Sequence, residues 1–512
     1  MAAMSLIPLF VTLLFSSAAA SAAQSPSVIV VGAGMSGISA AKTLYEAGIK
    51  DILILEASSR IGGRMMKADF SGYTVEMGAN WFFSGGPVAN PVIDLAKKVS
   101  LKSYPNDYSN ITGNTYKQEG GLYPKKDVEK VDEVAVARDE YCANFSRKLS
   151  ANKKKDVDVS ILAGQRLHGR PPLTPLDMVI DFYHNDYEDA EPPKVTSLKH
   201  TYPRGEFEEH GEDPHFVTDP RGFGVLVQYL ASQILKKGSP VQLKLKKVVR
   251  EIAYSKNGVT VKAEDGSTYS ANYVVVSASV GVLQSNLIQF KPKLPVGRLT
   301  LFSLSVSLSF IFISSISYTI KRFQMWKRIS ISDMSMTIYT KIFMKFPYKF
   351  WPSGGPGTEF FLYTHVQRGY YPLWQHLDNE YPGSNILMVT VTADESRRVE
   401  QLSNEAIQAE AMAVLKKIFG DKIPNPENIL VPRWGSHRFF KGSYANWPAN
   451  YNQEKHDQLG APVGPVYFTG EHNSNKFIGY VDGAHLEGIA TANDLIKCIK
   501  GEGCKGDKNM KM

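Results

Sequence analysis

Ser27-Val-Ile-Val-Val-Gly-Ala-Gly-Met-Ser-Gly37 is the stretch of sequence that decides the fold. Its apolar first part predicts a buried strand over residues 27–31, and the glycines after it open an amphipathic helix that ends near residue 48. Gly32 permits a tight turn, Gly34 lets the backbone approach a pyrophosphate, and Gly37 permits close packing of the helix on the strand. Because a helix N-terminus also favours anionic phosphates, the stretch predicts dinucleotide binding.

A carboxylate follows at the distance that a dinucleotide site requires. Residues 51–55 predict a second buried strand, and Glu56 closes it 19 residues after Gly37. A carboxylate there accepts hydrogen bonds from ribose hydroxyls and disfavours a 2′-phosphate. With 41 glycines in 512 residues, chance supplies about 0.3 such glycine motifs per chain. The strand, the helix and the carboxylate therefore carry the inference more than the glycines do.

Three further segments favour FAD over NAD. Arg60-Ile-Gly-Gly-Arg64 follows the carboxylate directly, so a glycine backbone can pass close to a second phosphate and ribose while the second arginine supplies positive charge. Glu76-Met-Gly-Ala-Asn-Trp81 places small residues where backbone can contact a flat ring. Val466-Tyr-Phe-Thr-Gly-Glu471 predicts a strand that ends in Gly-Glu. A helix that begins near residue 483 would stabilise negative charge on a reduced flavin.

Length and composition are those of a two-domain globular protein. A chain of 512 residues exceeds one ordinary core, and 43% hydrophobic and 21% charged residues are typical of globular proteins. The net charge of +8 is spread along the chain, with its densest run at Lys153–Lys155. We therefore expect a solvated basic surface and no nucleic-acid partner.

Three cysteines are too few for a disulfide scaffold. Cys498 and Cys504 lie six residues apart with two glycines between them, which predicts a small disulfide in an exported protein. Cys142 is then left as a buried free thiol.

The N-terminus predicts export. Leu6–Phe15 is an apolar run of signal-peptide length, and Ala20-Ser-Ala22 offers a cleavage site of small residues, although the α-amino group alone supplies charge before it. The run falls short of the roughly 20 apolar residues of a membrane anchor. We expect a signal peptide over residues 1–23 and a secreted protein. Export makes the glycosylation sequons at Asn110 and Asn144 usable.

The segment Leu299–Ile320 does not match the rest of the chain. Its 22 residues carry no charge and are long enough to span a bilayer, but seven serines, partly alternating with apolar residues, also fit a strand. A third interpretation, which we favour, is a retained intron. Val296-Gly-Arg fits a GT-initial donor site, Phe323-Gln324 fits an acceptor, and removal of residues 296–324 joins Leu-Pro directly to Met-Trp-Lys. A native insertion and a membrane segment stay open as alternatives.

Together these segments resemble the flavin amine oxidase family, which includes monoamine oxidases and histone demethylases, and within it the extracellular polyamine oxidases of plants. The similarity covers about residues 27–500, except the segment around Leu299. It includes specific stretches in the order of the family: Asp186-Tyr-Glu-Asp-Ala-Glu-Pro-Pro193, Ile288-Gln-Phe-Lys-Pro-Lys-Leu-Pro295, Ile338-Tyr-Thr-Lys-Ile-Phe343, Thr392-Ala-Asp-Glu-Ser-Arg-Arg398 and Phe468-Thr-Gly-Glu-His472.

The resemblance implies an α/β fold, α+β overall, in two interrupted parts. A Rossmann-like FAD-binding domain would take residues 26–98, 216–295 and 438–500. A substrate-binding domain would take residues 99–215 and 325–437, with a mixed six-stranded sheet flanked by helices. Residues 501–512 would form a C-terminal tail. The substrate tunnel is expected between the two domains.

The resemblance also assigns residues to the cofactor, and it implies no metal. The positions matched to FAD are Gly32, Gly34, Met35, Ser36, Gly37, Glu56, Arg64, Gly78, Ala79, Asn80, Val249, Trp434, Gly470, Glu471 and Tyr480. Lys341 matches the lysine that holds a water near flavin N5. Buried beside the ring, this lysine would have a lowered pKa and would assist proton removal or the reaction of reduced flavin with oxygen.

Aromatic and acidic side chains are expected in the tunnel. The resemblance makes Glu188 and Tyr339 catalytic candidates beside Lys341, and it assigns substrate contacts to Glu188, Phe83, Asp189, Tyr444, Tyr480 and Trp81. Two of these positions depart from the family pattern. Plant relatives carry Glu where this chain has Phe83, and Phe where it has Asp189. We therefore expect polyamine oxidation with an altered affinity or site of cleavage.

The expected reaction is oxidation of spermidine or spermine at a neutral secondary amine. Hydride passes to flavin N5, the imine hydrolyses to an aminoaldehyde and an amine, and O2 is reduced to hydrogen peroxide. We expect a monomer in the plant apoplast without stable membrane association. The alternatives are an oxidase of another amine, such as an amino acid held by an arginine, and a catalytically impaired isoform disrupted by residues 296–324. The signal peptide argues against a chromatin-directed demethylase.

Overall fold

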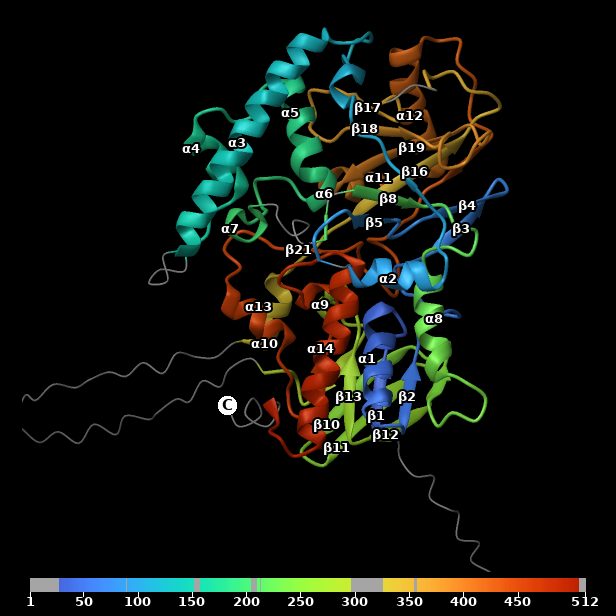
Figure 1. The fold of residues 1–512 in the computed structure, drawn as a ribbon, viewed down its shortest axis with the longest axis vertical. Coiled ribbons are helices and arrows are strands. Elements are labelled where there is room, and N and C mark those ends of the chain that lie inside the picture. Colours follow the sequence, from blue (N-terminus) through green and yellow to red (C-terminus); the bar gives the residue numbers. More distant parts are fainter. Residues whose placement is uncertain are drawn as a thin grey trace, which may run out of the picture.

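The computed structural model describes residues 27–505, apart from residues 89, 152–156, 204–209, 212, 296–325 and 354–356. The predicted signal peptide, the lysine run Lys153–Lys155 and the segment Leu299–Ile320 lie outside the described residues. The described chain forms two halves, stacked along the long axis of the molecule (Figure 1).

The elements follow one another along the chain in three groups. The first group is β1 (Val28–Val31), α1 (Met35–Glu46), β2 (Ile52–Leu55), β3 (Lys67–Phe70), β4 (Tyr73–Glu76), β5 (Trp81–Ser84), α2 (Pro91–Lys98), β6 (Ser103–Pro105), η1 (Ile111–Asn114), β7 (Thr115–Tyr116), α3 (Lys125–Ala151), α4 (Ile161–His168), α5 (Pro175–Asp181), η2 (Phe182–Asp186), α6 (Tyr187–Asp189), α7 (Leu198–Thr201) and β8 (Asp213–Val217). The second is α8 (Val225–Ile234), β9 (Gln242–Lys244), β10 (Val249–Ser255), β11 (Gly258–Ala263), β12 (Thr268–Ala271), β13 (Tyr273–Val276), α9 (Val280–Gln284) and β14 (Gln289–Lys291). The third is α10 (Lys327–Asp333), β15 (Ser335–Met336), β16 (Tyr339–Lys345), β17 (Phe360–Tyr363), β18 (Leu373–His376), β19 (Ile386–Thr392), α11 (Ala393–Val399), α12 (Asn404–Phe419), β20 (Asn428–Leu430), β21 (Ala445–Asn446), α13 (Gln453–Gly460), β22 (Val466–Phe468), η3 (Glu471–Asn473) and α14 (Val481–Ile499).

A parallel sheet forms the centre of the lower half. Its strands lie in the order β22-β13-β1-β2-β9, and each neighbouring pair is parallel. Strand β1 is apolar at every position because both faces of the sheet are covered. Val28 and Val30 join the core formed with α1, α8 and α14, whereas Ile29 and Val31 join the core that contains β10 and β11. The expected strand, glycine turn and helix are therefore present.

The upper half is built on a mixed six-stranded sheet, in the order β20-β16-β19-β18-β17-β7. Only the β17–β7 pair is parallel. Ile342 and Met344 of β16 pack in one core with Ile407 and Ala411 of α12. Because successive side chains point to opposite faces of a strand, Lys341 and Phe343 face away from α12. The α/β class and the six-stranded sheet of the substrate half are confirmed.

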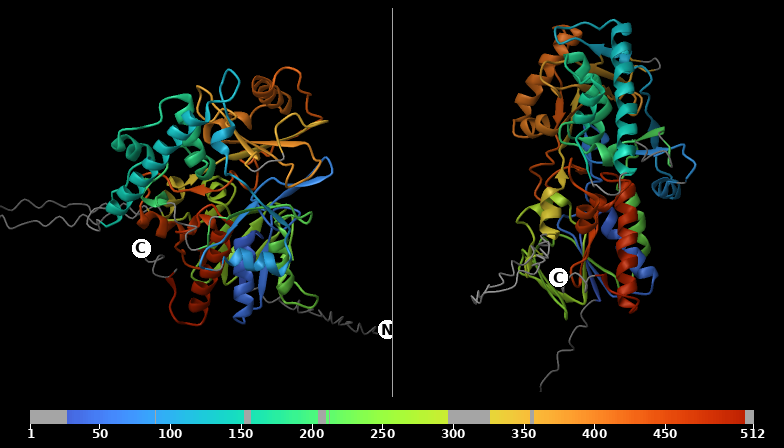
Figure 2. Two further views of the ribbon diagram at one scale, coloured as in Figure 1. Left: turned by 45° about the horizontal axis from the view of Figure 1, so that its top comes forward. Right: turned by 90° about the vertical axis from the view of Figure 1, so that its left-hand side faces the viewer.

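Several helices are longer than their sequence patterns predicted. Helix α3 covers Lys125–Ala151, whereas the hydrophobic spacing in the sequence predicts a helix only over residues 131–149, and α14 begins at Val481 rather than near residue 483. The added turns are polar or begin at a glycine-rich loop, so hydrophobic periodicity does not mark them. Figure 2 shows α3 standing beside the upper half and α14 beside the lower half.

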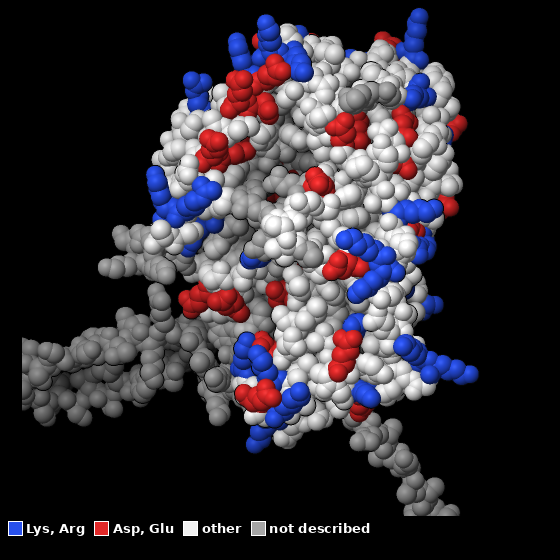
Figure 3. All heavy atoms as spheres, in the orientation of Figure 1, with Lys and Arg blue, Asp and Glu red and all other residues white. Residues whose placement is uncertain are grey.

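The cysteines are arranged as expected. Cys498 and Cys504 form a disulfide at the end of α14, and Cys142 of α3 is buried outside this disulfide. Lys and Arg side chains alternate with Asp and Glu over the face shown in Figure 3. Among the helices in the described part of the chain, none is long and apolar enough to cross a bilayer.

The chain on both sides of residues 296–325 is anchored in one apolar cluster. Leu294 before them and Trp326 after them are both buried in the core of β10, β11 and α10. Lys327 is fully buried, and its Nζ donates hydrogen bonds to the carbonyls of Leu459 and Ala461 at 2.5 and 2.7 Å. The chain before residue 296 and the chain after residue 325 are thus each held by contacts with other parts of the protein.

We predict that a protein lacking residues 296–324 folds and binds flavin as the full chain does. Because the anchoring contacts survive the deletion, its unfolding temperature should stay within about 5 °C of that of the full chain. Thermal melting and flavin absorbance of both purified proteins measure this. A deletion protein that aggregates or takes up no flavin would show that the segment is needed to connect its flanks, and it would remove the retained-intron interpretation.

Candidate active site

A cavity of about 940 Å³ lies between the two halves. Nearly all predicted site residues line it, although they come from distant parts of the sequence. The predicted residues that line the cavity are Gly32, Gly34, Met35, Ser36, Glu56, Arg64, Gly78, Ala79, Asn80, Trp81, Phe83, Glu188, Asp189, Val249, Tyr339, Lys341, Trp434, Tyr444, Gly470, Glu471 and Tyr480. Gly37 is not among them. It lies behind the turn, where a Cβ would come within 2.1 Å of the Gly32 carbonyl oxygen, so its role is packing.

The glycine turn leaves room for a phosphate. Gly32 has φ +101°, and a Cβ there would lie 2.8 Å from the carbonyl oxygen of Ser277. A Cβ on Gly34 would meet only the Cα of Gly63, at 3.8 Å, so this position is open toward the cavity. No side chain caps the N-terminus of α1, which leaves its first N–H groups for an anion. The arrangement fits a pyrophosphate.

Glu56 lines the same end of the cavity, held by two backbone groups. Its Oε2 accepts a hydrogen bond from Ala33 N and its Oε1 one from Ser58 N, both at 2.8 Å. Because a carboxylate can accept about four hydrogen bonds, two remain for ribose hydroxyls. The chemistry of this carboxylate therefore fits the adenosine end of FAD.

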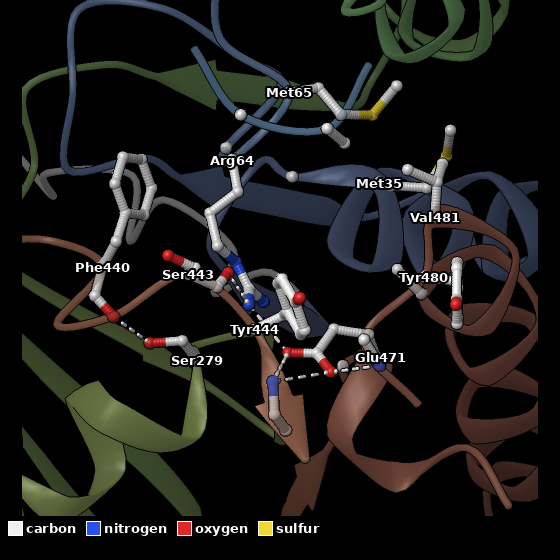
Figure 4. A pocket seen from close by; sticks show the side chains of 18 of the residues that line it. Met35, Arg64, Met65, Ser279, Phe440, Ser443, Tyr444, Glu471, Tyr480 and Val481 are labelled. Carbon is white, nitrogen blue, oxygen red and sulfur yellow. Dashed lines mark hydrogen bonds and ion pairs between the residues drawn. The ribbon is translucent and has the colours of Figure 1, made fainter. Parts of the chain in front are cut away.

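An ion pair joins the arginine motif to the C-terminal Gly-Glu. Arg64 Nη1 donates to Glu471 Oε1 at 2.7 Å and to the Ser443 carbonyl at 2.9 Å. Glu471 Oε2 also accepts from Gly479 N at 2.9 Å. Burial opposes ionisation of Glu471, but the Arg64 guanidinium and these partners hold its pKa below the ordinary value. Figure 4 shows both side chains meeting at the cavity, with Tyr444 beside them.

Lys341 points into the cavity from β16 and is 2% exposed. Its Nζ donates to the Gly78 carbonyl at 2.6 Å and to Asn80 Oδ1 at 2.8 Å, and it lies 5.4 Å from the centre of the Trp81 ring. Burial lowers the pKa of Lys341 to about 7, although the charge of Glu76 opposes the shift. The amine can therefore gain or lose a proton near neutral pH.

Tyrosines form the wall next to this lysine. The ring of Tyr339 lies 6.0 Å from Tyr187 and 5.9 Å from Tyr444, measured between ring centres. Burial raises the pKa of all three phenols well above the ordinary value. They stay neutral at any pH near neutrality, so the wall is aromatic and uncharged.

Two carboxylates enter the cavity from α6. Tyr480 OH donates to Glu188 Oε1 at 2.6 Å, and Tyr444 OH donates to the Glu188 carbonyl at 2.7 Å. Asp189 is buried beside it and lines the cavity. Phe83, on β5, presents its ring edge to Tyr480 with centres 6.3 Å apart. Two carboxyl groups thus enter from α6, while β5 contributes an apolar ring through Phe83.

Several cavity residues were missed by sequence reasoning. Tyr187 lies between Asp186 and Glu188, inside a stretch that the resemblance had already singled out. Its position in that stretch was therefore a usable signal. Asn106 and Ser443 lie in loops without a motif, and no pattern marks them. Within the described residues, no group of His, Cys, Asp and Glu is arranged to hold a metal ion.

Comparisons with known proteins agree with this geometry. The sequence profile of the family described as flavin containing amine oxidoreductase matches residues 35–496. Polyamine oxidase 1 of Zea mays is 50% identical over 493 residues, which cover 94% of this chain and 92% of that protein. Polyamine oxidase 6 of Oryza sativa subsp. japonica is 47% identical over 495 residues, with the same coverage. The solved structure of a wild-type putrescine oxidase bound to putrescine has a TM-score of 0.66 and 19% identity, covering 92% of this chain and 99% of that one.

Proposed function

The chain belongs to the family of flavin-containing amine oxidoreductases, and from this premise we propose that it oxidises the polyamines spermidine and spermine at a secondary amine. Its cofactor is FAD. The observation that carries the proposal is the pair Glu188 and Asp189, set beside a wall of neutral tyrosines in the cavity that contains Lys341. Carboxylates and aromatic faces together suit a flexible chain with separated ammonium groups.

FAD held along Gly34, Glu56 and Arg64 would supply the redox chemistry, which is two-electron oxidation of the carbon–nitrogen bond with O2 as the final acceptor, so that hydrogen peroxide and a hydrolysable imine would be the products. The residues of this chain bind and orient the amine. Tyr480 and Tyr444 fix Glu188 through its carboxylate and its carbonyl. Lys341, held by Gly78 and Asn80, can take a proton at Nζ. A neutral substrate nitrogen is required because a protonated amine is a poor hydride donor.

The cavity argues against a substrate that carries a carboxylate. Such a substrate needs an arginine to clamp it. Among the described residues that line the cavity, Arg64 is the only arginine, and its guanidinium is bonded to Glu471 and to the Ser443 carbonyl. An amino acid would in addition meet the like charges of Glu188 and Asp189. This favours a purely cationic amine over an amino acid.

We predict that flavin reduction depends on the proton of Lys341. Because its pKa is lowered to about 7, the lysine loses its proton as pH rises through 7, and below that pH its protonation should add about a tenfold fall in rate per unit to the fall caused by protonation of the substrate amine. Anaerobic stopped-flow reduction by spermidine from pH 5.5 to 9 measures the wild type and Lys341→Met. The variant should be at least about 100-fold slower and should lose this limb. The further increase in the rate of flavin reduction at higher pH, caused by deprotonation of the substrate amine, should remain in both proteins. Identical pH profiles would remove Lys341 from the reductive step.

We predict turnover of spermidine, spermine or N-acetylspermine, with hydrogen peroxide as a product. Asp189→Asn keeps the size of the side chain and removes its charge, so KM for spermine should rise about tenfold with little change in kcat. The matched change Asp394→Asn, an exposed surface aspartate on α11, serves as the control and should change neither constant. No activity on any of the three amines in a yellow, folded protein would contradict the proposed function.

We further propose that the protein is exported, loses residues 1–23 and carries glycan at Asn144. The signal-like N-terminus and the disulfide support export. Asn144 is exposed on α3, whereas Asn110 is half-buried with its side chain packed against Gly113 and Gly357. Expression in plant cells should deliver a protein to the medium that begins near Gln24 and loses mass with peptide N-glycosidase. Retention inside the cell with Met1 in place would contradict export.

A further inference from the structure

A buried polar network lies behind the cavity wall that Trp81 forms. Trp81 Nε1 donates to Asn106 Oδ1 at 2.6 Å. The amide nitrogen of Asn106 in turn donates to Glu359 Oε1 and, at 2.7 Å, to Glu380 Oε1. Gln375 Nε2 donates to the same two oxygens, at 2.9 Å each. Asn106, Glu359, Gln375 and Glu380 are all buried, so none of these bonds competes freely with water.

The network determines how the amide of Asn106 is oriented. Its nitrogen must face the two carboxyl groups because they accept hydrogen bonds, and its oxygen must then face the indole N–H. An amide turned the other way would place an oxygen against two carboxyl oxygens and an N–H donor against another donor. Burial makes such unpaired groups costly, so one orientation of Asn106 and one position of the indole N–H are favoured.

We propose that Asn106, held by Glu359 and Glu380, is a positioning residue that fixes the plane of Trp81 against Lys341 and the reacting part of the cavity. Lys341 Nζ lies 5.4 Å from the centre of the Trp81 ring, within the range of a cation–π contact. Tyr187 and Phe216 meet the ring edge to face at 6.4 and 5.6 Å but bond no polar atom of it. The effect on the reaction rests on the proposed function, whereas the position of Trp81 does not.

The two carboxyl groups are not equivalent, and this asymmetry provides a matched test. Both oxygens of Glu359 accept bonds: Oε1 from Asn106 and Gln375, and Oε2 from Asp107 N at 3.0 Å. The bonds that Glu380 accepts from Asn106 and Gln375 are both on Oε1, and its Oε2 accepts neither. Burial raises the pKa of both carboxyl groups, and the neighbouring Glu359 raises that of Glu380 further, well above the ordinary value, so a proton on this pair is held by Glu380.

Glu380→Gln should therefore be tolerated and Glu359→Gln should not. A glutamine at position 380 keeps an oxygen for both donors and places its NH2 where the protonated oxygen was. A glutamine at position 359 must turn its NH2 toward a donor whichever way it is placed. The two variants make the same chemical change in the same network with opposite expected outcomes.

The test begins with the oxidised holoenzyme and no substrate. The chain has six tryptophans, and Trp81→Phe identifies the resonance of the Trp81 indole N–H after 15N labelling of tryptophan. Exchange of this proton with solvent should be at least tenfold faster in Glu359→Gln and within twofold of wild type in Glu380→Gln. Equal exchange in all three proteins would overturn the proposal. If Glu359→Gln does not fold, Asn106→Ala tests the same bond, and unchanged exchange there would overturn it equally.

Anaerobic flavin reduction by spermidine then tests the consequence for the reaction. Glu359→Gln should reduce the rate constant about tenfold in the wild-type background and by less than twofold in a Trp81→Phe background, because it acts through Trp81. An equal loss in both backgrounds would show general destabilisation and would overturn the positioning role. A wild-type flavin that no polyamine reduces would contradict the proposed function, while the exchange measurement would still decide the position of Trp81.

Discussion

The ion pair between Arg64 and Glu471 is the contact on which the cavity depends, because it joins residues 407 positions apart in the sequence. It connects the loop after β2 to the end of β22, and through the Ser443 carbonyl it includes the segment that enters β21. Loss of either partner would leave a charge in a largely buried place, which proteins tolerate poorly. The two walls that receive FAD are thus held together by a contact that neither wall can form alone.

The parts of the site that follow a local pattern could be predicted from the sequence. The carboxylate of Glu56 bonds to the backbone of Ala33, 23 residues before it, and a strand followed by a glycine turn and a helix is a local signal. Lys341, the tyrosines of the cavity wall and Glu188 were found through the family resemblance. The longer course of α3 required coordinates, whereas the packing role of Gly37 follows from its place in the glycine motif.

Asn106 shows why the rest was out of reach. It follows a short strand, belongs to no motif and becomes meaningful only where Glu359 and Glu380, more than 250 residues later, converge on it. The two cavity positions Phe83 and Asp189 are a second example of a feature that needed the structure. The sequence shows Phe83 and Asp189 as two departures, but only the structure shows the charge on α6 and the ring on β5. Arg368 forms an ion pair with the buried Asp186, which directly precedes α6. This ion pair helps to hold Glu188 and Asp189 in place.

The order of strands in the parallel sheet has a consequence for synthesis of the protein. Strand β1 lies between β13 and β2, and β13 pairs with β22 at residues 466–468. At a translation rate of roughly 5–20 residues per second, the ribosome needs on the order of 20–90 seconds after making β1 to deliver that last strand. Strand β13 must therefore wait, with its outer edge in the apolar sheet uncovered, until residues 466–468 emerge. A chaperone that covers this edge during elongation would be an expected need of the nascent chain.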